Sequence, residues 1–205
     1  MKTLFIPAKS EIEIEPLLKK VKLKGKTGIL TTVQHLDKVK KLKGFVFGGQ
    51  VLGCNAINAK KIQNKVDQFL YIGSGRFHPI EIALETNKPV YTLNPFTEEF
   101  KELNQKDIDK IRKKIKGAYL KYLTSNKIGI IISSKPGQNK LKEAMKLKTD
   151  KQVYYFLCNN ITNQIENFPD IDIWVNTACT RLAYEGEFNA SIINLQDLLP
   201  LLQSF

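Results

Sequence analysis

The sequence predicts an α/β protein made of two repeated units, each with a small, mainly parallel sheet flanked by helices. Apolar runs of strand length alternate along the chain with segments whose apolar residues recur at helical spacing. Such alternation is typical of parallel strands joined by crossover helices. A second observation is that the pattern of the first half starts again after a long polar stretch, 98–125, which has helical spacing of its own.

The first half contains five short apolar runs separated by polar or helical segments. We predict strands at 3–8, 26–32, 45–47, 67–72 and 89–93. Between these runs, apolar residues at helical spacing predict helices at 11–23, 33–42 and 80–87.

The second half repeats features of the first. Residues 127–134 read as lysine, one residue, glycine, an apolar run and two hydroxyls, as residues 26–32 do. Asp172 and the apolar run after it match Asp67 and its run, and this alignment sets Cys179 opposite Ser74. We therefore predict further strands at 127–134, 153–158 and 173–178.

These repeats divide the chain into two predicted units, 1–112 and 113–205, the first carrying Cys54 and the second Cys179. Parallel sheets place loops and ligands at the carboxyl ends of their strands. Cys54 follows one such end, inside a segment with three glycines, 47–56, and Cys179 follows another. We expect the two thiols to face one shared site.

Composition bounds the class of protein. The net charge is +12, almost all from lysine, and hydrophobic residues make up 42% of the 205-residue chain. No apolar run approaches the ~20 residues that cross a bilayer. Three cysteines and no secretion signal predict a cytoplasmic chain with reduced thiols. Solvated lysine-rich helix faces account for the charge, and the shortage of arginine and interleaved aromatics argues against direct nucleic-acid binding.

Several motifs leave a structural and a functional interpretation open. Gly73-Ser74-Gly75 follows a strand and could cradle an anionic group or simply form a turn, and it lacks the third glycine of the dinucleotide fingerprint. His35 and His78 lie at strand-to-helix junctions, where a capping role competes with a chemical one. The cysteines show no C-x-x-C spacing, so buried structural thiols are the alternative to a metal site, and Cys158 reads as part of an apolar strand.

Eight stretches in order along the chain resemble the family of 2-(3-amino-3-carboxypropyl)histidine synthases, which perform the first step of diphthamide synthesis. They include the segments around Cys54 and Cys179 and cover nearly the whole chain. The stretches are Phe5 to Ala8, Leu30 to His35, Gly49 to Asn55, Tyr71 to Pro79, Lys88 to Val90, Asn94 to Thr97, Lys135 to Gln138 and Val175 to Cys179.

The resemblance implies a [4Fe–4S] cluster held by one cysteine from each of three α/β units, with Cys54 and Cys179 at the second and third positions. It implies that the open iron binds S-adenosylmethionine and that the reduced cluster breaks a sulfur–carbon bond. The 3-amino-3-carboxypropyl radical then adds to a histidine of translation elongation factor 2. The loops with Gln34 and His35, Gly73, Ser74 and Gly75, and Gln138 are candidate walls for S-adenosylmethionine.

The sequence departs from the family pattern because the first unit, with the first cluster cysteine, has no counterpart in it, and Thr180 replaces the usual proline after the last cysteine. Our first hypothesis is the C-terminal part of a split transferase, completed by a separate chain or by a homo-oligomer. A noncatalytic binding or scaffold subunit of the same pathway is the alternative. A basic RNA-binding module is a third hypothesis.

Overall fold

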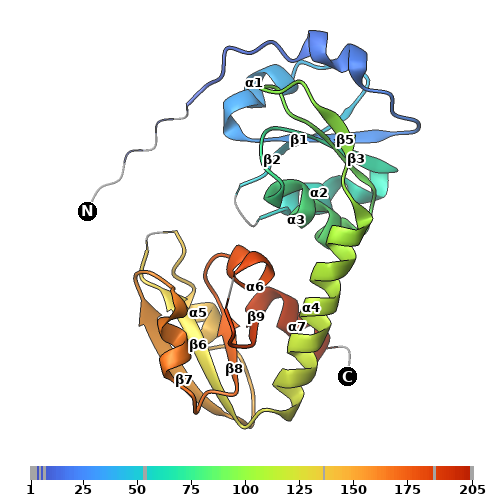
Figure 1. Cartoon of the computed structure of the whole chain (residues 1–205). Coiled ribbons are helices and arrows are strands. Elements are labelled where there is room, and N and C mark those ends of the chain that lie inside the picture. Colours follow the sequence, from blue (N-terminus) through green and yellow to red (C-terminus); the bar gives the residue numbers. More distant parts are fainter. Residues whose placement is uncertain are drawn as a thin grey trace. The chain divides into compact units, whose positions relative to one another are not determined.

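The computed structural model describes residues 4, 6, 8–52, 55–135, 137–186 and 188–203. The chain divides into two compact units, Met1–Ile108 and Asp109–Phe205. Helix α4 (Gln105–Thr124), green to yellow in Figure 1, contains this division. The two units are described separately below.

Unit 1 contains a five-stranded sheet in the order β2-β1-β3-β4-β5. All neighbouring strands are parallel except β4 and β5, which are antiparallel. The strands are β1 (Thr27–Thr31), β2 (Val46–Gln50), β3 (Gln68–Ile72), β4 (Val90–Leu93) and β5 (Phe100–Glu102). The helices are η1 (Glu15–Lys20), η2 (Val33–His35), α1 (Leu36–Val39), α2 (Ile57–Ile62), η3 (Gln63–Lys65) and α3 (Phe77–Thr86).

Two apolar cores cover the two faces of this sheet, because successive strand residues point to opposite sides. Leu30 and Phe69 pack with residues of α2 and α3, such as Ala59 and Ile82. On the other face, residues such as Leu70 pack with residues of η1 and α1. Helices therefore cover both faces, and β1 and β3 are buried along their whole length.

Unit 2 contains an all-parallel sheet in the order β7-β6-β8-β9. Its strands are β6 (Lys127–Ser133), β7 (Gln152–Cys158), β8 (Ile173–Asn176) and β9 (Ile192–Asn194). Its other helices are α5 (Leu141–Ala144), η4 (Asn163–Asn167), α6 (Arg181–Glu185) and α7 (Leu195–Leu202). One core packs α4, α5 and α7 against strand residues such as Ile130 and Val175. Phe156, Phe168 and Trp174 form a separate aromatic cluster.

The repeat predicted from the sequence is present in the strand register. Gly28 pairs with Phe69 in unit 1, and Gly129 pairs with Trp174 in unit 2. Each glycine makes room for the ring beside it, since an added Cβ would lie 2.8 Å from Phe69 and 2.6 Å from Trp174. Together with the observed layers, this confirms the predicted α/β class with small, mainly parallel sheets.

The carboxylates before β3 and β8 repeat as well. Asp67 accepts a hydrogen bond of 2.7 Å from the Lys26 backbone N–H at the start of β1. Asp172 accepts bonds of 2.8 and 2.9 Å from the backbone N–H groups of Asn126 and Lys127 at the start of β6. These bonds hold the pKa of Asp172 below its usual value. Asp67 and Asp172, which match in the sequence, therefore both accept hydrogen bonds from the backbone at the start of the first strand of their unit.

Several segments differ from the sequence predictions. The strand predicted at 45–47 continues to Gln50 as β2, and the helix predicted at 33–42 ends at Val39. In the segment 3–8, the described residues Leu4, Ile6 and Ala8 lie in no strand, and Leu4 and Ile6 are exposed. The helix predicted at 11–23 shortens to the 3₁₀ helix η1, in which Pro16 occupies the first turn. The stretch 98–125 contains β5 as well as α4, because Phe100 packs on the ring of Tyr91 across the hairpin.

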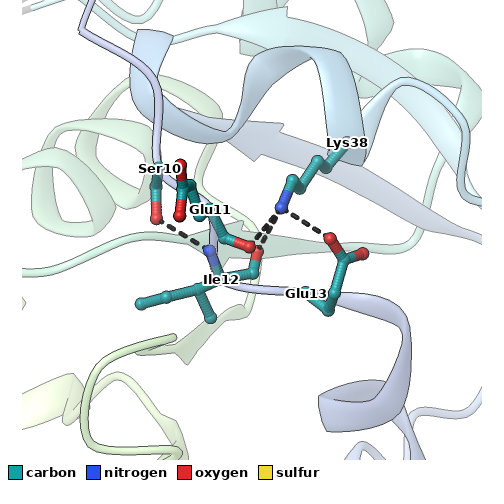
Figure 2. A network of polar contacts seen from close by, with 5 residues as sticks. All are labelled: Ser10, Glu11, Ile12, Glu13 and Lys38. Atoms are coloured by element: carbon teal, nitrogen blue, oxygen red, sulfur yellow. Dashed lines mark hydrogen bonds and ion pairs between the residues drawn. The ribbon is translucent and has the colours of Figure 1, made fainter.

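The segment before η1 is fastened by Lys38 of α1 (Figure 2). The Lys38 ammonium donates to the backbone oxygens of Glu11 and Ile12, at 2.5 and 3.1 Å, and to the Glu13 carboxylate at 2.7 Å. Ser10 accepts a bond from the Ile12 N–H. Because one cation gathers three oxygens, these polar bonds hold α1 and the segment 10–13 together, in addition to the apolar core that Ile12 and Val39 share.

Within the part of the chain that the structure describes, none of the helices combines the length and apolar character that a membrane crossing requires.

Candidate functional site

The strand order of each unit creates one point at which the chain changes direction across the sheet. In unit 2 the first strand, β6, has β7 on one side and β8 on the other. In unit 1, β1 lies in the same way between β2 and β3. At this point the loops that follow two neighbouring strands run to opposite sides of the sheet. They leave a crevice at the carboxyl ends of those strands, where α/β proteins bind ligands. Most of the predicted site residues follow these strands.

In unit 2 the crevice is an open cavity of about 590 Å³. Its lining comes from the loops after β6, β7 and β8 and from α6. The residues are Ser133, Lys135 and Gln138, then Asn159 to Thr162, then Cys179, and finally Arg181, Leu182, Glu185 and Gly186. The predicted residues Gln138 and Cys179 are thus brought to one cavity, although about 40 residues separate them in sequence.

Cys179 is half-buried in the loop between β8 and α6. The loop begins at Thr177, whose buried hydroxyl donates 2.8 Å to the Ile131 carbonyl of β6. Asn176 donates 2.9 Å to the Cys179 carbonyl. The first bond ties the start of the loop to β6, whereas the second holds the backbone of Cys179 itself. The thiolate of a cysteine is the type of ligand that iron–sulfur clusters use.

Cys54 and Gly53 lie outside the described residues. Within the described residues, no group of three or more His, Cys, Asp or Glu side chains is arranged to hold a metal ion. A soft thiolate donor beside an open cavity fits a thiolate-bound metal group, and one thiolate does not hold such a group alone. The shared site of Cys54 and Cys179 therefore stays a prediction.

Cys158 ends β7, and its half-buried sulfur lies 3.8 Å from the Phe156 carbonyl oxygen. Burial raises the pKa of this thiol. A raised pKa favours the protonated thiol over the thiolate that binds metal. The neighbouring Asn159 and Asn160 line the cavity, whereas Cys158 is not among its lining residues. The structure therefore agrees with a structural role for Cys158.

In unit 1 the loop after β1 carries Gln34, which is exposed, and His35, which is fully buried. The His35 ring packs edge-on against Phe96, with ring centroids 6.0 Å apart. Neither ring nitrogen has a hydrogen-bond partner among the described residues. Burial, and then the charge of Lys38, lowers the pKa of His35. Both effects favour the neutral form of this buried side chain in the loop after β1.

The loop after β3 carries Gly73, Ser74 and Gly75. Glycine is required at Gly73 because a Cβ would lie 2.6 Å from the Tyr71 hydroxyl oxygen, and at Gly75 because its φ is +82°. Ser74 is exposed, and its carbonyl accepts a 3.4 Å bond from Tyr71. This conformation brings backbone groups to the start of α3, as an anion-binding turn requires.

A second cavity of about 280 Å³ adjoins this loop and is lined by Gly73, Gly75 and Arg76 together with residues of β4 and β5. Arg76 forms an ion pair with Asp107, which also lines the cavity. His78 stacks on Tyr71 with ring centroids 5.7 Å apart, and burial raises the pKa of Tyr71 to about 12. Predicted residues Gly73 and Gly75 thus line one cavity in unit 1.

Sequence reasoning missed a buried polar group beside Cys179. Asn176 and Asn194 end the neighbouring strands β8 and β9, and their amides are bonded to each other at 2.7 Å. An asparagine at the end of each of two otherwise apolar runs was the available signal. Their pairing was hidden because sequence alone does not show that β8 and β9 are neighbours.

Comparisons with known proteins agree with the resemblance read from the sequence. The chain is 30% identical over 208 residues to the 2-(3-amino-3-carboxypropyl)histidine synthase of Pyrococcus horikoshii. This match covers 88% of this chain and 59% of the relative. It is 32% identical over 203 residues to the synthase of Methanocaldococcus jannaschii, covering 90% of this chain and 57% of the relative. The chain thus spans less than two thirds of these curated relatives.

The structure is similar to that of Dph2 from Pyrococcus horikoshii, with a TM-score of 0.79 and 28% sequence identity. The match covers 96% of this chain and 64% of the Dph2 chain. A second structure of that Dph2, with the same similarity, contains a 4Fe-4S cluster. The sequence model of the family described as "Putative diphthamide synthesis protein" matches residues 1–204. With nearly its whole length matched, this chain belongs to the family of putative diphthamide synthesis proteins.

Proposed function

We propose that this chain is the C-terminal part of a [4Fe–4S] enzyme of diphthamide synthesis. The enzyme would transfer the 3-amino-3-carboxypropyl group of S-adenosylmethionine to a histidine of translation elongation factor 2. The observation that carries the proposal is Cys179, held beside an open cavity at the carboxyl ends of the strands of unit 2. Membership of the family and the cluster in the related Dph2 support it.

Cys54 and Cys179 are the proposed thiolate ligands from this chain. The role of Cys54 rests on the sequence resemblance, because it lies outside the described residues. We propose that a separate chain supplies the third thiolate, and a homo-oligomer is the alternative that the experiment below distinguishes. When bound, the cluster supplies the electron that breaks a sulfur–carbon bond of S-adenosylmethionine.

The remaining residues have proposed binding roles. Gln138 presents an exposed amide at the cavity of Cys179, where it can hold a polar end of S-adenosylmethionine. Ser74 and Gly75 lie just before α3, where their backbone N–H groups can face an anionic carboxylate, and Gly73 lines the adjoining cavity while its own N–H donates to the Leu93 carbonyl. Gln34 is exposed and can reach a ligand, whereas the buried His35 supports its loop by packing. Gln34, Gly73, Ser74, Gly75 and Gln138 are the proposed walls for the cofactor, and His35 would act only through its loop.

The testing experiment is anaerobic reconstitution with iron and sulfide, read by absorption and EPR. It compares the unaltered chain with Cys54→Ser, Cys179→Ser and the matched control Cys158→Ser, each alone and with a candidate chain carrying the first unit. We expect a cluster with the partner, its loss in Cys54→Ser and Cys179→Ser, and its retention in Cys158→Ser. The same samples, reduced with dithionite and given labelled S-adenosylmethionine and elongation factor 2, report transfer.

Each other outcome has a defined meaning. A cluster on the chain alone, at a protein concentration that favours dimers, would point to a homo-oligomer. Retention of the cluster in Cys179→Ser would refute the assigned ligand. A chain that forms no cluster under any condition, yet restores transfer by an active partner, would be a noncatalytic subunit of the same pathway.

A further inference from the structure

Two buried asparagines lie behind the cysteine loop of unit 2. Asn176 is 2% exposed and Asn194 is 1% exposed. A buried amide costs free energy unless its donors and acceptor are all paired. The two residues end β8 and β9, in strands whose other members are isoleucine, tryptophan and valine. Because an apolar side chain would fill these positions without that cost, we infer that the two amides have a specific role.

The two amides are fully paired, and most of their bonds go to the loop that carries Cys179. Asn176 accepts from the Ala178 N–H at 3.0 Å and donates to the Cys179 carbonyl at 2.9 Å. Its second N–H donates to the Asn194 amide oxygen at 2.7 Å. Asn194 in turn donates to the Thr180 carbonyl at 3.3 Å. Backbone groups on both sides of the thiol are therefore fixed by side chains of the sheet.

The second N–H of the Asn194 amide donates to a charged group. Asn194 donates to the Asp197 carboxylate at 2.9 Å, and the Tyr184 hydroxyl donates to the same carboxylate at 2.9 Å. Asp197 lies in the first turn of α7, where a negative charge is favourable. Because every amide N–H has one acceptor, only one orientation of each asparagine satisfies the network. We call Asn176 and Asn194 the amide clamp.

Unit 1 provides an internal comparison. The register places Tyr71 and Ser74 at the positions of Asn176 and Cys179, because Phe69 and Trp174 are equivalent. Tyr71 donates to the Ser74 carbonyl, but at 3.4 Å. In unit 1 a single side-chain bond of 3.4 Å reaches the loop that carries the Ser74 hydroxyl. In unit 2 three side-chain bonds of 2.9 to 3.3 Å reach the loop that carries the Cys179 thiol. A fold requirement shared by both units does not explain this difference.

We propose that the amide clamp positions Cys179 for metal ligation by fixing the backbone on both sides of the thiol. The proposal rests on the proposed function in that a metal cluster is the group for which Cys179 is held. Asn176 and Asn194 are positioning residues, since they act through the loop and reach no metal themselves. A ligand held rigidly before metal arrives loses less conformational freedom on binding.

Thiol modification tests the clamp without any metal. In the full chain with Cys54→Ser and Cys158→Ser, Cys179 is the only thiol, and its rate of reaction with N-ethylmaleimide reports opening of its loop. Asn176→Ala removes both loop bonds of that residue, so we expect the rate to rise on the order of tenfold. Asn194→Ala leaves the bonds from Asn176 to the loop, so a smaller rise is expected, and this variant serves if Asn176→Ala does not fold.

The matched control is Thr177→Val, which has nearly the same shape as threonine. It removes the buried bond to the Ile131 carbonyl but no bond to the Cys179 or Thr180 carbonyls. Its reaction rate should stay within a factor of about two of the parent chain, even where its thermal stability falls as far as that of the clamp variants. Equal rates in Asn176→Ala and Thr177→Val would overturn the clamp.

Reconstitution separates the clamp from the proposed function. With all cysteines restored, Asn176→Ala should hold less cluster than Thr177→Val, with an altered EPR spectrum. If the unaltered chain forms no cluster with any partner, the proposed function fails, and the modification rates still decide whether the clamp fixes the loop. If the rates respond but cluster content and spectrum match the control, the link from loop to metal ligation is refuted.

Discussion

At the scale of single residues, the structure separates side chains that share a loop. Gln34 and His35 are adjacent in sequence, yet one is exposed and the other is fully buried. The buried imidazole has no hydrogen-bond partner among the described residues and lies near the Lys38 ammonium. Both conditions favour the neutral ring, because a charge there would lose its hydration and face another cation.

This burial predicts a specific pH dependence of stability. The pKa of His35 is lowered in the folded chain from 6.5. The unfolded chain therefore binds a proton that the folded chain excludes as pH falls below 6.5, and stability falls with it. In His35→Leu, the loss of melting temperature between pH 7.5 and 5.5 should be smaller than in the unaltered chain. Equal slopes, measured by circular dichroism, would contradict this assignment.

At the scale of elements, the repeated contact of a strand glycine with an aromatic ring explains why the two sheets share a register. Gly129 of β6 lies against Trp174 of β8, which is 1% exposed and held by Phe156 and Phe168. Because β6 and β8 are paired neighbours in this register, the loops after them meet at one crevice. A glycine chosen for packing thus helps to build the candidate site.

The element scale therefore predicts opposite effects at two glycines. In Gly129→Ala, the new Cβ would lie 2.6 Å from the Trp174 ring, which has no room to move, so the chain should lose about 1–3 kcal/mol of unfolding free energy. In Gly117→Ala, nothing lies within 4 Å of the new Cβ on α4, so the chain should gain about 0.5–1 kcal/mol. Urea unfolding measures both, and a stabilising Gly129→Ala would refute the packing argument.

At the scale of the whole molecule, each unit has its own sheet, and two apolar cores flank the sheet of unit 1 while a further core packs on that of unit 2. The observed division falls at Ile108, within α4. Trp174 is the single tryptophan of the chain, so its fluorescence reports unit 2, whereas far-UV circular dichroism reports both units. We propose that the two units unfold as separate cooperative bodies.

Gly28→Ala tests this proposal, because its Cβ would lie 2.8 Å from the Phe69 ring in unit 1. The urea midpoint followed by circular dichroism should fall, and the midpoint followed by Trp174 fluorescence should stay unchanged. Gly129→Ala is the reciprocal variant and should move the fluorescence midpoint. A shift of both signals by Gly28→Ala would show that the two units unfold as one.

Much of this protein's fold, and the family to which it belongs, can be predicted from short segments of its sequence. Apolar runs of strand length, bounded by lysine, aspartate or glycine, predicted the inner strands β1, β3, β6 and β8, because buried parallel strands need continuous apolar residues. The repeated glycines and aspartates predicted the two units. The short segments around Cys54 and Cys179 indicated the family, since such loops carry chemistry that packing alone does not require.

The tertiary structure decided what these local signals could not. Strand order made neighbours of β6 and β8, and so brought Gln138 and Cys179 to one cavity. The amide clamp joins Asn176 and Asn194 across two strands, and the burial of His35 depends on Phe96 from a distant loop. Each is a contact between segments far apart in sequence, whose partner is set by how crossovers place strands in the sheet and not by the residues on either side.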